Sequence, residues 1–356
     1  MLARTSSRPE KLARYTVANM SESRREFVKA SIGATAVSAL ASQAIAQQNS
    51  GNGIPTRRLG RTNEQVPILC VGGAHLGRAA QDDGEKAGLK LAHTALDNGL
   101  FFWDNAYVYL DGYAEKFMGR ALKGKRNKVF LMTKNSGRDY KFAQECLETS
   151  LRRLQTDHLD LWQFHETNYD NDPDWVFEKG GLKFALEAQK AGKVRYIGFT
   201  GHKHPRIHTK MLNKGYDWAT AQMPINPMDH FYRSFQRQVV PICNAKDVGV
   251  LGMKSLGGGP RVAEIPSTTK VTAEMCVRWA LSLPISSLVR GYLNTEQLMA
   301  DVKIARDFKP LDEAARKTIM ALAEPEAGDG RHEHFKSTQR YDGPLYRKMH
   351  GFALDT

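Results

Sequence analysis

The stretch Gly99-Leu-Phe-Phe-Trp-Asp-Asn-Ala-Tyr-Val-Tyr109, with Lys128-Val-Phe-Leu-Met-Thr-Lys134 after it, contains two short apolar runs that each end in a charged residue. The charged residues are Asp104 and Lys134, and Tyr109 follows the first run. A third run, Leu159–Phe164, ends in His165. If these runs are parallel strands of one barrel, their carboxyl ends converge on the face where barrel enzymes carry out chemistry.

The wider chain predicts a βα alternation around this stretch. Eight apolar runs are expected as strands, at 66–71, 100–104, 129–133, 159–164, 194–199, 218–222, 248–252 and 285–289. Helical periodicity is found at Glu85–Asn98, Glu115–Leu122, Phe142–Leu154, Trp175–Ala191, Pro205–Asn213, Gln236–Asp247, Ala273–Leu283 and Thr295–Asp307. Eight βα units without a break favour a closed (β/α)8 TIM barrel over an open sheet. No Gly-x-Gly-x-x-Gly follows the first strand, which disfavours a Rossmann fold.

The barrel is expected over 57–323, with a small N-terminal hairpin arm at Arg57–Thr62. A last helix, Leu311–Leu322, and a C-terminal tail at 324–356 that packs on the barrel complete the predicted organisation. Residues 47–56 are polar and indicate a linker.

Residues 1–46 indicate an export signal. Ser23-Arg24-Arg25-Glu26-Phe27 precedes a mild apolar run that ends in Ala44-Ile45-Ala46. This order is typical of a secretory signal, and the paired arginines resemble the twin-arginine motif. The run is too short and too weakly apolar for a stable membrane anchor. We therefore expect export to the periplasm by the twin-arginine machinery, with translation starting at Met20.

Composition narrows the classes of ligand. The 356 residues are 41% hydrophobic and 25% charged, with a net charge of +13. A positive charge favours anionic ligands such as a phosphorylated cofactor. Nucleic acid is not an expected partner, because the basic residues are scattered and no recognition motif accompanies them. The four cysteines are far apart, which disfavours zinc and iron–sulfur sites and favours buried thiols.

The residues at the strand ends suit the reduction of a carbonyl group. Such a reaction needs a proton donor for the oxygen, and a Tyr hydroxyl, with its pKa of about 10, is a poor acid by itself. Lys134 can strengthen Tyr109 as an acid, Asp104 can hold Lys134, and His165 can orient the substrate oxygen. The alternative is structural: a buried Asp104–Lys134 ion pair, a core histidine and a tyrosine that anchors a loop.

The chain resembles the aldo-keto reductases over roughly residues 56–310. The resemblance rests on Asp104-Asn-Ala-x-x-Tyr109, Gly112-x-x-Glu115, Gly119-x-Ala-Leu122, Thr133-Lys134, Ser150-Leu-x-x-Leu154, Asp157-x-x-Asp-Leu161 and His165. It implies a barrel that binds NADP(H) in an extended pose, with Asp104, Tyr109, Lys134 and His165 as the catalytic tetrad and Tyr109 as the proton donor. The leader, Gly198-Phe-Thr-Gly-His202 and the tail are similar to the exported bacterial members.

The resemblance also implies a set of cofactor-binding residues. Gly198–His202 matches the segment that holds the carboxamide in many members, although it reads Thr-Gly-His here, and Gln222 is the expected partner of the nicotinamide amide. The loop 251–258 corresponds to the region near the pyrophosphate, or is a plain glycine-rich loop. The expected cofactor contacts are Thr200, Gln222, Lys254, Arg290, Gly291 and Gln297, with Arg290 as the candidate for a 2′-phosphate.

Three further side chains are predicted to contact the substrate, and two pairs of histidines are given no functional role. His75, after the first strand, and Phe231 and Tyr232, after the sixth, are the expected substrate contacts. His202-Lys-His204 and His332-Glu-His334 are interpreted as exposed loop histidines, because neither pair has a third ligand at a diagnostic spacing. No metal site is therefore predicted.

The leading hypothesis is an exported, NADPH-dependent reductase of a small aldehyde or ketone. A second hypothesis is an exported cofactor-binding sensor or regulatory partner that turns over poorly, because the periplasm is not known for a pool of NADPH. A metal-dependent hydrolase on the same barrel is disfavoured, since Lys134 occupies a strand end where such an enzyme needs a metal ligand.

Overall fold

A computed structural model describes residues 48–49, 53–258 and 263–353, all within a compact unit of residues 46–356. The predicted signal segment, 1–46, lies outside the described residues, and the predicted linker, 47–56, is described only in part. Within the described residues, no helix is both long enough and apolar enough to cross a membrane.

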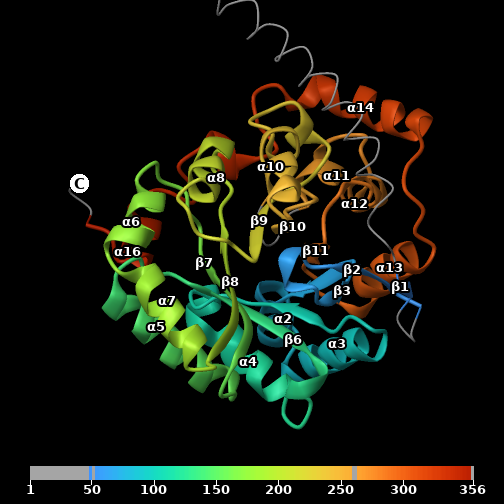
Figure 1. The fold of residues 1–356 in the computed structure, drawn as a ribbon. Helices are drawn as coiled ribbons and strands as arrows, with labels where there is room; N and C mark the ends of the chain where they lie inside the picture. Colours follow the sequence, from blue (N-terminus) through green and yellow to red (C-terminus); the bar gives the residue numbers. More distant parts are fainter. Residues whose placement is uncertain (1–47, 50–52, 259–262, 354–356) are drawn as a thin grey trace, which may run out of the picture. The chain divides into compact units, whose positions relative to one another are not determined.

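Eight parallel strands close into a barrel (Figure 1), which confirms the predicted (β/α)8 architecture. Each strand pairs with the next along the chain, and the last pairs with the first. The strands are β4 (Leu69–Gly72), β5 (Phe102–Asp104), β6 (Phe130–Asn135), β7 (Leu159–Phe164), β8 (Val194–Thr200), β9 (Thr220–Pro224), β10 (Gly249–Met253) and β11 (Ser287–Arg290). Their carboxyl ends therefore meet at one face of the barrel.

Helices surround the strands and continue beyond them in the C-terminal segment (Figure 1). They are α2 (Gly73–Asp82), α3 (Glu85–Asp97), α4 (Tyr113–Ala121), α5 (Tyr140–Leu154), α6 (Asp172–Glu178), α7 (Gly181–Lys190), α8 (Pro205–Leu212), α9 (Phe235–Gln238), α10 (Val240–Ala245), α11 (Glu264–Thr268), α12 (Ala273–Leu281), α13 (Thr295–Arg306), α14 (Glu313–Ala327), α15 (His334–Ser337) and α16 (Pro344–Met349). Short 3-10 turns occur at η1 (Gly60–Thr62), η2 (Tyr109–Gly112), η3 (Arg126–Lys128) and η4 (Met228–His230).

The predicted first strand, 66–71, is two strands. Its first part belongs to β3 (Gln65–Pro67), which pairs with β2 (Pro55–Arg58) in the N-terminal hairpin, and only β4 enters the barrel. Pro67 has no amide hydrogen and ends the hairpin strand. The chain changes partners at the next residue, where the Ile68 amide donates to Pro55 while its carbonyl accepts from Leu288.

Glycines and a proline explain the differences in the helices. The sequence did not predict α2, because Gly73 and Gly77 are poor helix formers. A Cβ at Gly73 would lie 2.5 Å from the Asp104 carbonyl oxygen, so the close packing of α2 requires glycine. The predicted helix 175–191 is divided at Gly180, which has a φ of 90°. The helix predicted at 236–247 is divided into α9 and α10, where Pro241 begins a new first turn.

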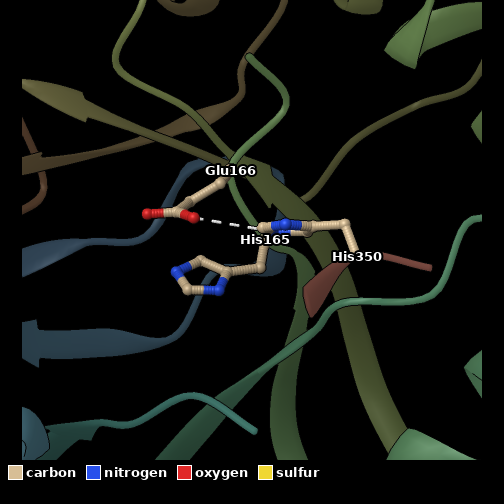
Figure 2. A group of neighbouring side chains, drawn as sticks. All are labelled: His165, Glu166 and His350. Carbon is tan, nitrogen blue, oxygen red and sulfur yellow. Dashed lines mark ion pairs between the residues drawn. The ribbon is translucent and has the colours of Figure 1, made fainter. Parts of the chain in front are cut away.

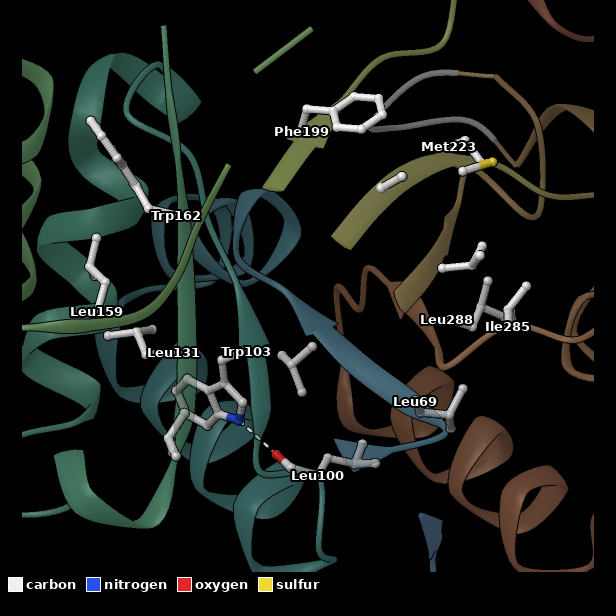
Figure 3. Close-up of a cluster of buried hydrophobic side chains, with 14 of the residues drawn as sticks. Leu69, Leu100, Trp103, Leu131, Leu159, Trp162, Phe199, Met223, Ile285 and Leu288 are labelled. Atoms are coloured by element: carbon white, nitrogen blue, oxygen red, sulfur yellow. Dashed lines mark hydrogen bonds between the residues drawn. The ribbon is translucent and has the colours of Figure 1, made fainter. Parts of the chain in front are cut away.

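The core has an outer layer between strands and helices and an inner cluster within the barrel. Figure 3 shows part of the outer layer, in which Trp103, Trp162 and Phe199 are buried among aliphatic side chains. The Trp103 indole donates a hydrogen bond to the Leu100 carbonyl at 2.7 Å. Leu161, beside Trp162 in β7, belongs to the inner cluster instead, as the alternation of a strand requires.

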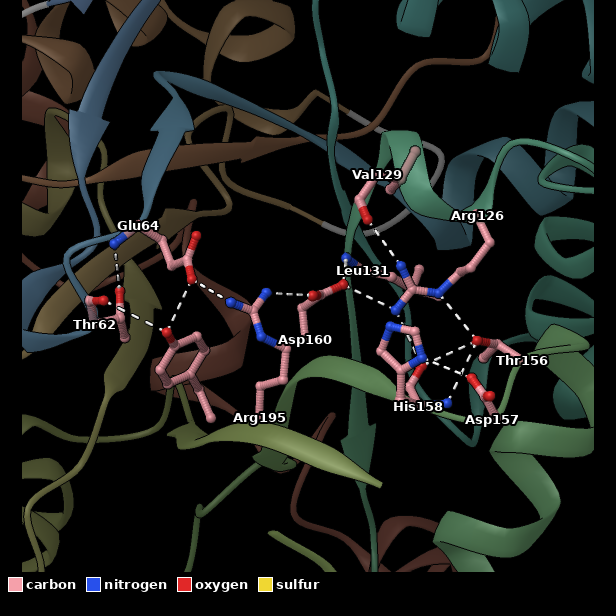
Figure 4. A network of polar contacts seen from close by, with 11 residues as sticks. Thr62, Glu64, Arg126, Val129, Leu131, Thr156, Asp157, His158, Asp160 and Arg195 are labelled. Carbon is pink, nitrogen blue, oxygen red and sulfur yellow. Dashed lines mark hydrogen bonds and ion pairs between the residues drawn. The ribbon is translucent and has the colours of Figure 1, made fainter. Parts of the chain in front are cut away.

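The N-terminal hairpin packs at the amino-terminal ends of the strands. Its residues Leu59 and Val66 belong to the inner cluster. Figure 4 shows the polar contacts beside it: Asp160 accepts from Arg126 at 2.9 Å and from Arg195 at 2.7 Å, and Arg195 also pairs with Glu64 of the hairpin. Packing and ion pairs thus close the amino-terminal end of the barrel. The candidate catalytic residues lie at the opposite face, at the carboxyl ends of the strands.

The C-terminal segment after α14 packs on the carboxyl-end face. Lys336 is fully buried and pairs with Asp229 at 2.6 Å and Glu333 at 2.8 Å. Farther along, the Tyr341 carbonyl accepts a hydrogen bond from Asn168, and the Phe352 ring lies 4.6 Å from that of Trp175. The segment is therefore held at several points along its length.

All four cysteines are buried and free. Burial raises the pKa of the thiols of Cys146, Cys243 and Cys276 to about 12, and that of Cys70 well above its ordinary value. The prediction of buried thiols is confirmed.

Candidate active site

Three successive strands bring Asp104, Lys134 and His165 to one point. Asp104 ends β5, Lys134 lies near the end of β6, and His165 directly follows β7. The Lys134 ammonium donates to the Asp104 carboxylate, and also to the Asn105 carbonyl at 2.7 Å. It also donates to the hydroxyl of Tyr109 at 3.4 Å. The structure thus places the four predicted catalytic side chains together.

Tyr109 begins the turn η2, which returns the chain over the end of the barrel. Leu110 and Asp111 in this turn have φ values of 53° and 52°, a conformation uncommon for residues with side chains. The Tyr109 ring stands edge-on to the His165 ring, with 5.5 Å between centroids. The turn therefore directs the hydroxyl into the space between Lys134 and His165.

The electrostatics of Tyr109 differ from the expectation. The sequence predicts that Lys134 strengthens the acid, but burial and the neighbouring Asp104 raise the pKa of Tyr109 well above 10. Burial also raises the pKa of Asp104, although Lys134 opposes this effect. Tyr109 thus keeps its proton at neutral pH, which is the state a proton donor requires.

His165 is neutral and fixed through its backbone. Burial lowers the pKa of its imidazole well below 6.5, and Lys134 contributes in the same direction. Its amide donates to the Asn135 carbonyl at 2.8 Å, and its carbonyl accepts from Arg138 at 2.6 Å. Arg138 in turn pairs with the fully buried Asp172 at 2.8 Å. The sequence did not indicate this supporting pair, because Arg138 lies in the loop after β6 and Asp172 begins α6.

Glu166 is a second residue that sequence reasoning missed. It has a φ of 49°, and its amide donates to the Thr200 hydroxyl at 3.1 Å. One carboxylate oxygen lies 3.2 Å from Nε2 of His202. The other lies 3.6 Å from Nε2 of His350, which reaches the site from the end of α16 (Figure 2). The only feature of the sequence that could have indicated Glu166 as a site residue is its place directly after His165, at the end of a predicted strand.

Two of the expected cofactor residues lie inside the barrel mouth. Gln222 in β9 is buried, and its side-chain oxygen accepts from Gln163 at 2.8 Å. Thr200, at the end of β8, is also buried, and it accepts the Glu166 amide. Both therefore face the same strand ends as the tetrad.

Two basic side chains, Lys254 and Arg290, lie after β10 and at the end of β11, with Ser255 beside Arg290. Nζ of Lys254 lies 4.6 Å from the centroid of the Tyr341 ring, and burial lowers its pKa to about 8. The ion pairs of the described residues do not include Lys254. Arg290 pairs with Asp301 at 2.6 Å and donates to Ser255 at 3.3 Å. A buried ammonium without a carboxylate partner fits an anionic ligand such as a phosphate.

The comparisons with known proteins agree with this geometry. Residues 68–271 match the model of the aldo/keto reductase family. The chain belongs to this family. It is 27% identical over 248 residues to the aldo-keto reductase AMT2 of Alternaria alternata, an alignment that covers 57% of this chain and 65% of that protein. It is 42% identical over 205 residues to the methylglyoxal reductase YeaE of Escherichia coli, covering 55% of this chain and 66% of that one. The chain thus spans about two thirds of these relatives.

Among solved structures, the fold is similar to that of the aldo-keto reductase AKR11C1 from Bacillus halodurans in its holo form. The TM-score is 0.63 at 23% identity, over 76% of this chain and 96% of that one. An aldo-keto reductase from Klebsiella pneumoniae in complex with NADPH gives a TM-score of 0.62 at 19% identity, over 76% and 95% of the two chains. These likenesses support the barrel fold of this aldo-keto reductase.

The remaining expected contacts of this aldo-keto reductase have structural partners of their own. Gly291 lies against His75, since a Cβ there would be 2.0 Å from the His75 ring. The side-chain oxygen of Gln297 accepts the Leu293 amide at 2.9 Å at the start of α13. Gln297 therefore caps a helix here, and its role toward a cofactor stays a prediction.

Phe231 and Tyr232 lie under the C-terminal segment. Phe231 packs against a cluster that includes residues of α12 and α14. The Tyr232 ring touches Gly330, and its carbonyl accepts from Lys336 at 2.9 Å. A role of either residue in binding substrate stays a prediction.

The interpretation of the paired histidines as exposed is wrong. His202 and His332 are buried. His202 reaches Glu166, as described, and His332 lies 3.1 Å from the Thr268 hydroxyl. The C-terminal segment covers loops that composition alone marks as surface.

Proposed function

We propose that this aldo-keto reductase reduces an aldehyde or ketone with NADP(H) as hydride donor and Tyr109 as proton donor. The observation that carries the proposal is the hydrogen-bonded set of Asp104, Lys134 and Tyr109 beside a neutral His165. The family match supports an oxidoreductase that binds a nicotinamide cofactor, and the proposal adds the proton donor and the kind of substrate.

The residues present suit such a cofactor. Gln222 and Thr200 offer polar groups near the tetrad, where a nicotinamide amide requires them. Lys254 supplies a buried positive charge, and Arg290 a second one, for the phosphates. The N-terminus of α13, which Asn294 caps, adds backbone amides that favour anions. When bound, NADPH supplies the hydride.

The protein side chains handle the proton and the orientation of the substrate. A neutral His165 donates a hydrogen bond to the carbonyl oxygen or accepts one from the alcohol product, which positions the carbonyl carbon. The Tyr109 hydroxyl gives its proton to the oxygen as negative charge develops there. Lys134 then stabilises the tyrosinate that remains, and Asp104 keeps the ammonium in place.

Replacing the Tyr109 hydroxyl tests this assignment. We expect Tyr109→Phe to lower kcat for aldehyde reduction by roughly 10²- to 10⁴-fold, the usual contribution of a general acid. NADPH binding, measured by calorimetry, should change little. The control is Tyr107→Phe, because the Tyr107 ring lies over Arg153 and away from the tetrad contacts. Unchanged reduction by Tyr109→Phe would refute the role of Tyr109, whereas NADPH binding by the wild-type protein without turnover would favour the sensor hypothesis.

We also propose that the chain is exported by the twin-arginine pathway and works in the periplasm. The support is Arg24-Arg25 and Phe27 before the apolar run in the sequence. Expressed in a bacterium that carries the translocase, the doubly substituted Arg24→Lys, Arg25→Lys chain should accumulate in the cytoplasm. Lys86→Arg, on the exposed face of α3 and outside the motif, should leave export intact. Equal periplasmic yields from all three chains would contradict the proposal, and a recovered peptide from 1–19 would contradict a start at Met20.

A further inference from the structure

We propose that His165, Glu166 and His350 form a binding site for a divalent transition-metal ion, with zinc as the best fit. Each residue offers one ligand atom, and the three atoms lie within 4.8 Å of one another (Figure 2). Ligand atoms around tetrahedral zinc are about 3.3 Å apart, so a small movement of these side chains would complete the shell. Two imidazoles and one carboxylate are a usual zinc donor set, and the fourth position stays open for water.

The hydrogen bonding of His350 indicates what is missing from this cluster. Nδ1 of His350 lies 2.7 Å from the Tyr346 carbonyl, which can only accept, so this nitrogen carries the hydrogen. In the neutral ring Nε2 then presents a lone pair, and it faces Oε2 of Glu166 at 3.6 Å. Neither of these two atoms has a hydrogen-bond partner among the described residues. Two buried acceptors that face each other repel unless a cation lies between them.

The cluster is also held in place, as metal ligands usually are. The second oxygen of Glu166 contacts His202 at 3.2 Å, and the Glu166 amide donates to Thr200. Hydrogen bonds of this kind orient ligands around a metal. The φ of 49° at Glu166 is a strained conformation, and such strain is concentrated at functional sites.

The surroundings select the class of ion. Lys134, Arg138 and Lys254 all lie near enough to affect the charges of the three residues, and Glu166 is the one carboxylate in the ligand set. Calcium and magnesium need several oxygen ligands, which this site does not offer. Zinc, nickel and copper bind imidazole well enough to tolerate a positive environment.

Occupation of this site would have two consequences. A metal bound to His165 removes that imidazole from the substrate oxygen, so it would inhibit the reductase. The same ion would join β7 to α16, and it would fasten the C-terminal segment over the carboxyl ends of the strands. The inhibition rests on the proposed function, but the binding of metal does not.

Calorimetry of the metal-free full chain with zinc chloride tests the site directly. We expect one zinc per chain in the wild type and at least a tenfold loss of affinity in His350→Ala and in His350→Gln, which better preserves the packing. His158→Ala is the matched control, because His158 lies at the opposite end of the barrel and is partly exposed (Figure 4). Circular dichroism would show that the variants fold.

Cobalt(II) identifies the donors. The wild type should give the visible d–d bands of a four-coordinate nitrogen and oxygen site, and His350→Gln should lose them. A thiolate charge-transfer band would assign the metal to a cysteine and overturn the proposal. An unchanged affinity for zinc in both His350 variants would also overturn the proposal. The absence of stoichiometric zinc binding would overturn it too, and it would mean that only a proton lies between His350 and Glu166. Zinc binding without inhibition of reduction would keep the site and contradict the role of His165 in the reaction.

Discussion

At the scale of the residue, Lys134 and Asp104 form a buried ion pair, and the burial of such a pair carries a cost in stability. Their side chains are 1% and 3% exposed, and burial raises the pKa of Asp104 despite the ammonium beside it. Desolvation therefore outweighs attraction, as is common for buried pairs. The pair holds an ammonium 3.4 Å from the Tyr109 hydroxyl, which is the position that the proposed proton transfer requires.

A double-mutant cycle tests this view of the pair. Asp104→Leu or Lys134→Met alone leaves a buried charge without a partner, and each should lower the free energy of unfolding by roughly 3–5 kcal/mol. The double substitution should cost clearly less than the sum of the two. Urea denaturation measures all four chains. The exposed pair Glu313–Lys317 on α14 is the control and should give no measurable change on removal of either charge. Additive losses at Asp104 and Lys134 would mean that the two charges do not compensate each other.

At the scale of the element, the sequence predicted the strands better than the helices. The strands are apolar runs with a charged or polar end, and strands that are buried on both faces of a parallel sheet keep this pattern in the sequence. Helices depend more on what they pack against: α2 contains Gly73, which its close approach to the Asp104 carbonyl requires, and Gly77, which packs closely against Ala114 of α4. The break between α6 and α7 at Gly180 belongs to the same class, because periodicity continues across it.

The same difference applies to the site. The meeting of Asp104, Lys134 and His165 could be predicted because each lies at or beside the carboxyl end of a strand, and a barrel brings these ends together. Glu166 and His350 could not be predicted as partners, because His350 comes from the end of α16, far along the chain. Arg138 lies in the loop after β6 and Asp172 begins α6, so the two meet only in the folded protein.

At the scale of the whole molecule, this aldo-keto reductase buries several neutral histidines. Burial lowers the pKa of His165, His202 and His350, and it lowers that of His208 to about 4. Nε2 of His208 lies 3.1 Å from the Gln222 carbonyl, which favours the protonated ring, but burial outweighs this contact and the folded protein holds the neutral ring. Such a ring must gain its proton as the chain unfolds in acid.

Acid should therefore destabilise the fold in a defined window. Between pH 6.5 and about 4 the unfolded chain binds a proton at this position that the folded chain does not, so stability falls as pH decreases. His208 alone accounts for about 3 kcal/mol across this window, and above it has no effect. Urea denaturation at several pH values should show a shallower slope for His208→Gln and an unchanged one for His158→Gln. Identical slopes in all three chains would rule out His208 as a source of the acid sensitivity.

The burial of all four thiols bears on where such an enzyme can work. Thiolates, not thiols, react with oxidants and disulfides, and the raised pKa values leave almost no thiolate at neutral pH. Because the side chains are also inaccessible, neither peroxide nor a disulfide exchange catalyst can readily attack them. The four thiols consequently offer no ready point of attack, whether the compartment is reducing or oxidising.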